Sequence, residues 1–402
     1  QEVAVDPEMI GKVYESLVHV SEETSEQGEA GIFYTPRVEI DLMCRLSLVD
    51  WLTNHLGRCN KDRLYEAVFA FDLEDKEAAD RHLAQKNLWP QVRELLEHVT
   101  VVDPACGSGS FLVGMLQVLS DLLGRAADQL GEPDNAYARK KAIIANSLYG
   151  VDVMDWAVHV AELRLWLQLI IDVELEDIAQ PQEPLLPHLS FNIRPGDSLV
   201  QEVGGEDLSL RDNGRLPPSL RHRIAQLEQA KRSFFYGAPG GQADERQLKQ
   251  DELALFRAIL DYQIERQKGV VREATERVLP ATDVFGNDAG DLQTREKSLQ
   301  QLEVEQEQLA RLKREYDAIR SIDDLPFVWD IAFVEVLGGD KKGFDIVVGN
   351  PPYVRQESIH DPRQSQAEVS AADKRQYKAK LQHAVYTTWP ETFGYDWGSD
   401  KT

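Results

Sequence analysis

Hydrophobic residues recur at helical spacing along the first quarter of the chain. In residues 40–52 (IDLMCRLSLVDWL) and 88–99 (LWPQVRELLEHV), apolar side chains return every few positions on one side, which is the pattern of an amphipathic helix. We therefore expect residues 1–98 to form a mostly helical N-terminal region.

Short apolar runs then alternate with helical patterns. The runs typical of strands are 100–104 (TVVDP), 147–153 (SLYGVDV) and a third around 189–193 (LSFNI), and residues 110–124 and 155–171 between them have helical periodicity. Strands that alternate with helices form a parallel sheet, whose ligands bind beyond the carboxyl ends of the strands. The pattern predicts that residues 99–204 form the first half of an α/β domain.

The alternation stops over residues 205–325. One amphipathic helix is marked by Leu253, Phe256, Leu260 and Ile264. A second is marked by Leu299, Leu302, Leu309, Leu312, Tyr316 and Ile319. We expect an inserted helical hairpin, which is either a spacer or packing arm, or an arm that contacts a partner or DNA. The run FDIVVGN (344–350) then resumes the sheet as its fourth strand, within a last segment of residues 326–402.

The composition is that of a folded protein in a reducing compartment. The 402 residues are 42% hydrophobic and 28% charged, which excludes global disorder. Cys44, Cys59 and Cys106 have no metal-type spacing, so we expect a cytoplasmic location without disulfides or a zinc site. No apolar run approaches a membrane span, so no membrane partner is expected. The chain starts at Gln1 without a Met and stops at Thr402 without a closing element, and we expect a fragment of a longer protein.

The charge is uneven along the chain. A net charge of −25 argues against non-specific binding of polyanions by the chain as a whole. Residues 351–402 are nevertheless neutral, with equal numbers of basic and acidic side chains. Within them, residues 374–380 (KRQYKAK) form a basic cluster, which is either a solvated helix face or a phosphate contact.

The stretch VVDPACGSGSF (101–111) joins a strand, a glycine-rich turn and the start of a helix. Gly107 and Gly109 allow a close ligand approach that a Cβ would prevent, and the helix N-terminus near Ser110 attracts negative charge. The spacing matches neither the phosphate loop nor the dinucleotide pattern. We expect a ligand that is not held by a nucleotide phosphate; a tight turn without a ligand is the alternative.

Acidic residues follow the next two predicted strands. Asp152 ends the second strand, where a carboxylate can accept from both ribose hydroxyls, or it caps the following helix. Asp197 follows the third strand and either accepts from an exocyclic amine or serves as a turn aspartate. Together, the three strand ends predict one pocket for an adenosine-like ligand without a phosphate.

The fourth strand runs directly into Asn350, Pro351, Pro352 and Tyr353. Two consecutive prolines prevent a helix and end the pairing of the strand. Backbone carbonyls therefore stay free beside an amide and a phenol. Unless this is only a rigid turn that ends the strand, something binds at its tip.

DPACGSGSF together with NPPY resembles the S-adenosylmethionine-dependent amino-methyltransferases of DNA. More narrowly, the chain resembles the adenine-N6 methyltransferases of bacterial restriction-modification and phage-exclusion systems. Residues 31–36 (GIFYTP) are similar to the family's N-terminal cofactor motif, and the motif order is that of the gamma class. The resemblance covers the start of the chain and the sheet segments, but not the insert at 205–325.

This resemblance implies a Rossmann-like class I methyltransferase sheet with S-adenosylmethionine as cofactor. It implies double-stranded DNA as the partner, bound through a target-recognition domain outside this chain, and a fused or partner nuclease. Only four strands can be placed in the sequence, so we expect an incomplete sheet and weak or absent methyl transfer by these residues alone.

The resemblance also implies roles for individual residues. The segment 34–36 would contact the methionine end of the donor, the loop 103–111 would cradle it, Asp152 would hold the ribose and Asp197 the adenine amine. The implied cofactor-binding set is Tyr34, Thr35, Pro36, Asp103, Pro104, Ala105, Cys106, Gly107, Gly109, Ser110, Phe111, Asp152, Val153, Asp197 and Ser198. The implied catalytic set is Asn350, Pro351, Pro352 and Tyr353. No metal is expected, because the nine histidines form no metal spacing.

The chemistry explains why an amide and a proline carbonyl are needed. The adenine amine is a poor nucleophile because its lone pair is conjugated into the ring. If the Asn350 side-chain oxygen and the Pro351 carbonyl each accept one N–H, the lone pair can point at the sulfonium methyl. Tyr353 would stack on the flipped base, worth roughly 1–3 kcal/mol. Such catalysis rests on positioning and preorganised polarity.

Two other classes of protein stay open. Release-factor glutamine methyltransferases also carry NPPY, because a glutamine amide presents the same planar amine, and an RNA amino-methyltransferase is equally compatible with the motifs. The other class is a catalytically silent DNA-recognition or scaffold protein that keeps the fold.

Overall fold

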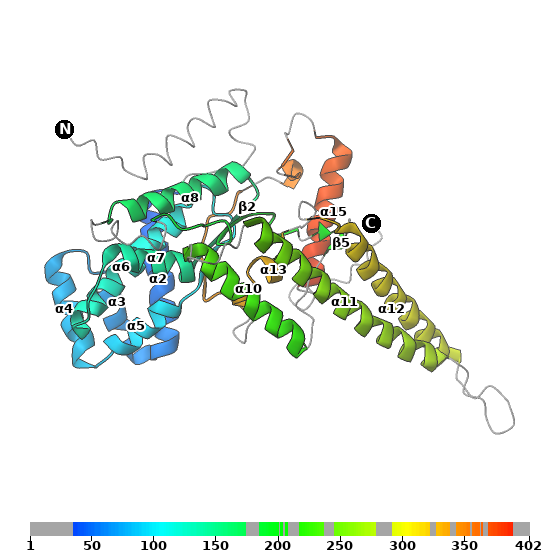
Figure 1. Ribbon diagram of the computed structural model, residues 1–402, viewed down its shortest axis with the longest axis horizontal. Coiled ribbons are helices and arrows are strands. Elements are labelled where there is room, and N and C mark those ends of the chain that lie inside the picture. The colour runs from blue at the N-terminus through cyan, green and yellow to red at the C-terminus, as the bar shows by residue number, and fades with distance from the viewer. Residues whose placement is uncertain are drawn as a thin grey trace, which may run out of the picture.

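The computed structural model has a small parallel sheet with helices on both faces (Figure 1). It describes residues 35–173, 185–200, 202–203, 206–207, 217–236, 245–278, 292–321, 327–337, 343–353, 356–361, 363–364 and 369–388.

Four parallel strands lie in the order β3-β2-β1-β6. They are β1 (Val101–Asp103), β2 (Leu148–Asp152), β3 (Ile193–Pro195) and β6 (Ile346–Val347). The chain moves from β1 outward to β3 and then returns to place β6 on the other side of β1. The gap between β1 and β6 is therefore a topological switch point, the place where open parallel sheets bind ligands.

Both faces of the sheet are buried, and side chains alternate between them as strand geometry requires. Val101 and Leu148 point into the main core cluster with α6 (Ser110–Leu130). Val102 and Tyr149 point to the opposite face, where Phe333 and its neighbours form a separate aromatic cluster. This cluster belongs to two short helices, α13 (Trp329–Ala332) and α14 (Val334–Leu337). Burial on both faces explains why the strands are apolar at nearly every position.

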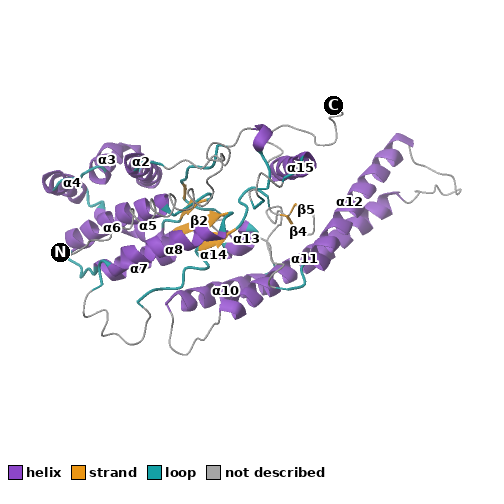
Figure 2. Ribbon diagram, turned by 90° about the horizontal axis from the view of Figure 1, so that it is seen from above, coloured by secondary structure: helices purple, strands orange, loops and turns teal. Residues whose placement is uncertain are grey.

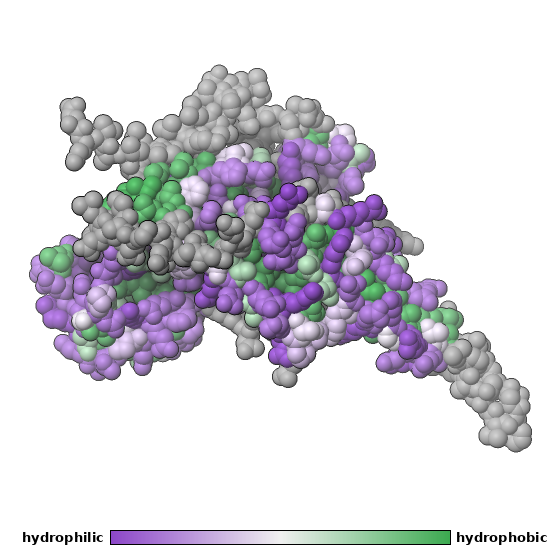
Figure 3. All heavy atoms as spheres, in the orientation of Figure 1, coloured by the Kyte–Doolittle hydropathy of each residue, from purple (hydrophilic) through white to green (hydrophobic). Residues whose placement is uncertain are grey.

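Helices on the α6 side form the larger layer. Besides α6 they are α2 (Arg37–Leu56), α3 (Lys61–Val68), α4 (Leu73–Gln85), α5 (Trp89–His98), α7 (Ala136–Ser147) and α8 (Asp155–Ile170), with a 3-10 turn η1 (Arg58–Asn60). Within the described residues, α6 is long and apolar enough to cross a membrane, but 72% of its apolar window is buried inside the protein. It is the core helix of this layer. Exposed hydrophobic side chains gather over α8, among them Leu163 and Ile170 (Figure 3).

Long helices follow the third strand. They are α10 (Pro218–Tyr236), α11 (Glu245–Val278) and α12 (Leu292–Ala318), preceded by a two-stranded ribbon of β4 (Glu202–Val203) and β5 (Glu206–Asp207). The helices α11 and α12 lie side by side and extend away from the sheet (Figures 1 and 2). They form the hairpin that the sequence predicts, whereas α10 was not predicted. The described residues end in η3 (Gln356–Ser358) and α15 (Ala371–Thr388).

A buried ion cluster joins this insert to the sheet domain. The Glu252 carboxylate on α11 is fully buried and lies 2.9 Å from Arg194 Nη2 on β3 and 3.1 Å from Lys231 Nζ on α10. Lys231 also lies 3.1 Å from the Glu335 carboxylate on α14. Burial alone would raise the pKa of Glu252, but the two cations hold it below the usual value.

The third strand lies later than the sequence predicts. It spans Ile193–Pro195 rather than 189–193. The Leu189 carbonyl accepts the N–H groups of Asn192 and Ile193, at 2.9 and 3.0 Å, so the preceding residues form a turn. Leu189 and Phe191 are apolar because their side chains are buried in core clusters, not because they pair in the sheet.

Candidate active site

The glycine-rich loop after β1 rests directly on the neighbouring elements. The N–H of Cys106 donates to the Val151 carbonyl at 2.9 Å, which continues the pairing with β2. Gly109 has φ +77°, and a Cβ there would lie 2.9 Å from Ala161 Cβ on α8. Gly107 also has positive φ, but apart from its two chain neighbours no atom of the described residues lies within 4 Å of its Cβ position. Gly109 is thus required for packing, whereas Gly107 borders open space that a ligand can enter.

A buried arginine that the sequence analysis missed holds this loop. Arg164 on α8 donates from Nη1 to the Ser108 carbonyl at 2.9 Å, to Ser108 Oγ at 3.0 Å and to Ser110 Oγ at 2.9 Å. The available signal was a single arginine within the strongly apolar segment 155–171, because a buried charge needs partners of its own.

Asp152 fixes the loop to the end of β2. Its Oδ2 accepts the N–H of Gly107 at 2.8 Å, and its Oδ1 accepts the N–H of Met154 at 3.0 Å. Burial raises the pKa of Asp152, and these backbone donors act against that rise. The capping alternative is wrong, because Met154 is the N-cap residue of α8 and makes no side-chain capping bond. The Oδ1 contact of Asp152 belongs to the turn before that helix, and the ribose contact stays a prediction.

Asp103 is the most unusual group in the site. Its side chain is buried, and Oδ1 accepts the N–H of Ala105 at 3.1 Å. Within the described residues, Oδ2 has no hydrogen-bond partner. Burial raises its pKa to about 7. A Cβ on Gly349 would lie only 2.4 Å from Asp103 Oδ1, so the carboxylate lies directly against the segment that leads into Asn350.

Asn350 meets the N-terminal motif at this switch point. Its Nδ2 donates to Thr35 Oγ1 at 2.9 Å, across 315 residues of sequence. Pro36 then begins α2 as its N-cap residue. Beyond Asn350 the chain turns outward, because Pro351, Pro352 and Tyr353 are exposed, the last at 70%. The structure thus brings three separate sequence motifs to one place.

Asp197 already has partners on both carboxylate oxygens. Oδ1 accepts the N–H groups of Leu199 and Val200, at 2.9 and 3.0 Å. Oδ2 accepts from the hydroxyl of Tyr377 on α15 at 2.7 Å, and burial raises the pKa of that phenol. The turn alternative therefore describes Oδ1, and a contact with an adenine amine stays a prediction. Ser198 next to it donates to the Pro104 carbonyl.

The remaining predicted residues lie around the loop. Cys106 and Phe111 are buried, and both belong to the main core cluster. Ala105, Ser110 and Val153 are partly buried. Tyr34 lies outside the described residues.

The site fits S-adenosylmethionine. That molecule carries an ammonium group, a sulfonium and two ribose hydroxyls, all of which favour nearby carboxylates. The buried carboxylate of Asp103 and the half-buried carboxylate of Asp152 lie at adjacent strand ends, and Asp103 Oδ2 has no protein donor in the described part of the chain. The described residues also contain no group of three His, Cys, Asp or Glu side chains that could hold a metal ion.

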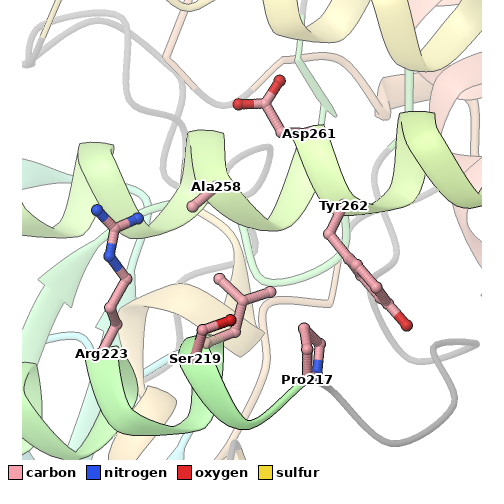
Figure 4. Close-up of a pocket in the computed structure, with 7 residues that line it drawn as sticks. Pro217, Ser219, Arg223, Ala258, Asp261 and Tyr262 are labelled. Atoms are coloured by element: carbon pink, nitrogen blue, oxygen red, sulfur yellow. The ribbon is translucent and has the colours of Figure 1, made fainter.

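A separate pocket lies in the insert, away from these motifs. It has a volume of about 340 Å³ and is lined by α10 and α11 side chains that include Arg223, Asp261 and Tyr262 (Figure 4). None of its lining residues belongs to a predicted motif.

Two models of known protein families match this chain. The family model described as Eco57I restriction-modification methylase matches residues 146–388, more than half of the chain. The chain belongs to the Eco57I restriction-modification methylase family. A second model, the DNA-methyltransferase domain of MmeI, matches residues 76–202. The glycine-rich loop of this Eco57I-family chain lies in the second match, and NPPY in the first.

Curated relatives agree with this membership. The chain is 28% identical to a type II restriction enzyme and methyltransferase of Methanocaldococcus jannaschii over 380 residues, 88% of this chain and 30% of the relative. It is 28% identical to the adenine-specific methyltransferase PglX of Streptomyces coelicolor, over 45% of this chain and 14% of the relative. DNA methyltransferase A of Bacillus subtilis is also 28% identical, over 31% of the chain and 14% of that protein. The Eco57I-family chain thus spans less than a third of each relative's length.

Proposed function

We propose that this chain is the methyltransferase part of a restriction-modification or phage-defence enzyme that methylates the N6 amine of adenine in DNA. The observation that carries the proposal is the meeting of Asp103, Gly349, Asn350 and Thr35 at the β1–β6 switch point. Two relatives are named as an adenine-specific and a DNA methyltransferase, which supports both the target base and the polymer.

In this proposal the residues after β6 bind the base. The Asn350 side-chain oxygen and the Pro351 carbonyl each accept one N–H of the amine, which weakens the conjugation of the nitrogen lone pair with the ring. Tyr353, which is 70% exposed, stacks on the base once it has left the duplex. The exposed NPPY segment leaves room for a base to approach from solvent.

The loop after β1 binds the donor. S-adenosylmethionine would be held by the 103–111 loop, by Asp152 and by the 34–36 segment, and it supplies an electrophilic methyl group on its sulfonium. Arg164 keeps the loop in place through Ser108 and Ser110. The unpartnered oxygen of Asp103 accepts from the donor's ammonium group. Exclusion of water by the buried loop strengthens these contacts.

The wider setting follows from the same proposal. The enzyme acts in the cytoplasm on double-stranded DNA, which a target-recognition domain outside these residues selects, and a fused or partner nuclease completes the system. The relative from Methanocaldococcus jannaschii is named for this combination of activities, restriction enzyme and methyltransferase.

The test is methyl transfer by the natural protein that carries this chain. Methyl-labelled S-adenosylmethionine is supplied with DNA, with RNA or with a cell protein extract, and the label is traced in each. We expect methyladenine in DNA, lost in Asn350→Ala but kept in the control Asn60→Ala, whose amide only bonds the Leu56 carbonyl. Label in protein or RNA alone identifies one of the other methyltransferase classes. Donor binding without any transfer identifies a silent scaffold.

A further inference from the structure

The hydrogen bond between Asn350 and Thr35 has a direction that matters for catalysis. Asn350 donates from Nδ2 and Thr35 accepts at Oγ1, at 2.9 Å. An amide has an NH₂ side and an oxygen side. With the NH₂ side engaged, the amide presents its oxygen to any other partner.

A target amine can use only one of these two faces. The amine brings N–H donors, so the NH₂ side of the amide would oppose it, and only Oδ1 can accept. An asparagine without a fixed partner can turn by 180° and present the wrong group. The observed hydrogen bond to Thr35 holds the amide in the orientation that the proposed chemistry needs.

Thr35 is itself held in place. It precedes α2, and α2 lies against α6 at Gly114, where a Cβ would be 2.7 Å from Ile40 Cγ2. One turn further, the Cys44 thiol donates to the Phe111 carbonyl at 3.7 Å. The helix α2, which follows Thr35, thus packs on α6, the helix that begins at the donor loop. Thr35 and the donor loop are therefore both positioned by α6.

We infer that Thr35 is a positioning residue whose hydroxyl orients the Asn350 amide. The inference rests on the proposed function for its meaning, because it concerns the same site. It predicts that loss of the hydroxyl slows methyl transfer without weakening the binding of S-adenosylmethionine.

The test compares Thr35→Val, which keeps the shape and removes the hydroxyl, with Thr35→Ser, which keeps the hydroxyl. For Thr35→Val in the natural protein we expect kcat to fall about 3–10-fold, the equivalent of one neutral hydrogen bond. The Kd for S-adenosylmethionine, measured by calorimetry, stays unchanged, and Thr35→Ser restores kcat. A raised Kd with unchanged kcat at saturation overturns the inference and returns Thr35 to the donor.

A second readout does not depend on activity. In a double-mutant cycle of Thr35→Val and Asn350→Ala, followed by equilibrium unfolding, the hydrogen bond predicts a coupling between the two changes. Additive effects overturn the inference. Coupling in a protein that methylates no DNA supports the positioning contact and overturns the proposed function instead, so the two failures are distinguishable.

An independent observation concerns the basic helix α15. Lys374 and Lys378 lie one turn apart on one face, with Arg375 beside them. Within the described residues, no carboxylate forms an ion pair with any of the three. Asp373, at the start of the helix, accepts from Ser370 instead. In a chain of net charge −25, these three side chains form a small cationic surface with no ion pair among the described residues.

The helix is fixed at the rim of the site. Tyr377, within the same cluster, donates to Asp197 at the end of β3, and Ser198 next to it donates to the carbonyl of Pro104 in the donor loop. A nucleotide that enters the site therefore carries its flanking phosphates close to this helix. Phosphates are the groups that unpaired lysines and arginines bind.

We propose that Lys374, Arg375 and Lys378 contact the phosphodiester backbone of the DNA beside the target adenine, which again rests on the proposed function. The test measures duplex binding by fluorescence anisotropy over a range of salt concentrations. For Lys374→Gln with Lys378→Gln we expect weaker binding and a salt slope lower by roughly two, with the Kd of the donor unchanged. The control is Arg266→Gln with Arg272→Gln on α11, which removes the same charge from the hairpin.

An unchanged slope in a protein that still methylates DNA overturns only the phosphate contact. Equal losses in the control pair also overturn it, because the effect is then one of net charge. A wild-type protein that binds no DNA at any salt concentration overturns the proposed function together with the phosphate contact.

Discussion

Two buried carboxylates show how differently the sheet domain and the insert are built. Glu252, in the insert, has Arg194 and Lys231 as partners, and its pKa is lowered despite complete burial. Asp103, in the site, has a single backbone donor and one oxygen without a protein partner in the described residues. Burial raises its pKa to about 7.

The partners of the two carboxylates indicate different roles: Glu252 holds the fold together, and Asp103 is available to bind a ligand. A buried charge with cations on two sides is compensated within the fold and ties elements together. A buried carboxylate with a free oxygen destabilises the protein alone and gains its partner from a ligand. A buried carboxylate therefore connects the insert to the sheet domain in one region, and lies in a candidate binding site in the other.

The largest expected effect comes from breaking the buried ion cluster around Glu252. Lys231→Met leaves the buried Glu252 with Arg194 alone and should lower the free energy of unfolding by about 3–5 kcal/mol, measured by denaturant unfolding. Adding Glu252→Gln should recover much of this loss, because the buried charge is then gone. No recovery in the double variant would mean that Lys231 acts by packing instead.

The next effect comes from filling the space beside Asp103. Gly349→Ala places a Cβ 2.4 Å from Oδ1 of that carboxylate, so methyl transfer should be lost and stability should fall by about 1–3 kcal/mol. Gly343→Ala is the matched control, because no atom of the described residues beyond its chain neighbours lies within 4 Å of its Cβ position. Equal behaviour of the two variants would show that the contact between Gly349 and Asp103 is not tight.

A smaller effect should appear in the pH dependence of stability. The folded pKa of Asp103, about 7, lies above the ordinary value of 3.8. Folding therefore takes up a proton between these pH values, and the free energy of unfolding falls as pH rises through them. Asp103→Asn should remove this pH dependence, because an amide does not titrate in this range. Parallel pH curves for wild type and variant would contradict the raised pKa.

The smallest expected effect is a gain of stability in the insert. Gly269 lies inside α11, and its Cβ position is open. Gly269→Ala should stabilise the protein by about 0.5–1 kcal/mol through the helix propensity of alanine, seen as a higher denaturation midpoint. Opposite signs at Gly269 and Gly349 would confirm that glycine is required at Gly349 and dispensable at Gly269. A loss at Gly269 would indicate an undetected contact on the hairpin.

The sequence predicts the parts of this fold that local pattern controls. The strands β1 and β2, the helices α6 and α8 and the hairpin α11–α12 lie where periodicity places them. The third strand was misplaced because burial of Leu189 and Phe191 in core clusters imitates the apolar pattern of a strand. The helix α10 was missed because its apolar positions are interrupted by basic side chains that include Lys231, which is buried through its ion pairs.

The candidate site was predictable as a set of motifs but not as a geometry. Motif spacing placed Asp103, Asp152 and Asn350 at strand ends. Asp103 and Asp152 are the last residues of β1 and β2, but β6 spans only Ile346–Val347 rather than 344–350, so Asn350 lies beyond its end. Their partners came from distant segments: Arg164 for the loop, Thr35 for Asn350 and Tyr377 for Asp197. A hydrogen bond across 315 residues leaves no local pattern, so only the folded chain shows it.

The pairing of β1 with β6 also has a consequence for the order in which the parts of the site are synthesised. Thr100 donates its N–H to the Asp345 carboxylate at 2.7 Å across 245 residues, and the whole insert must be translated between them. At about 5–20 residues per second, the glycine-rich loop leaves the ribosome about 10–50 s before NPPY. The insert adds little closure entropy, since each doubling of a loop costs only about 0.6 kcal/mol. The effect of the insert is instead a delay in synthesis: the glycine-rich loop is made well before the NPPY segment that packs beside it.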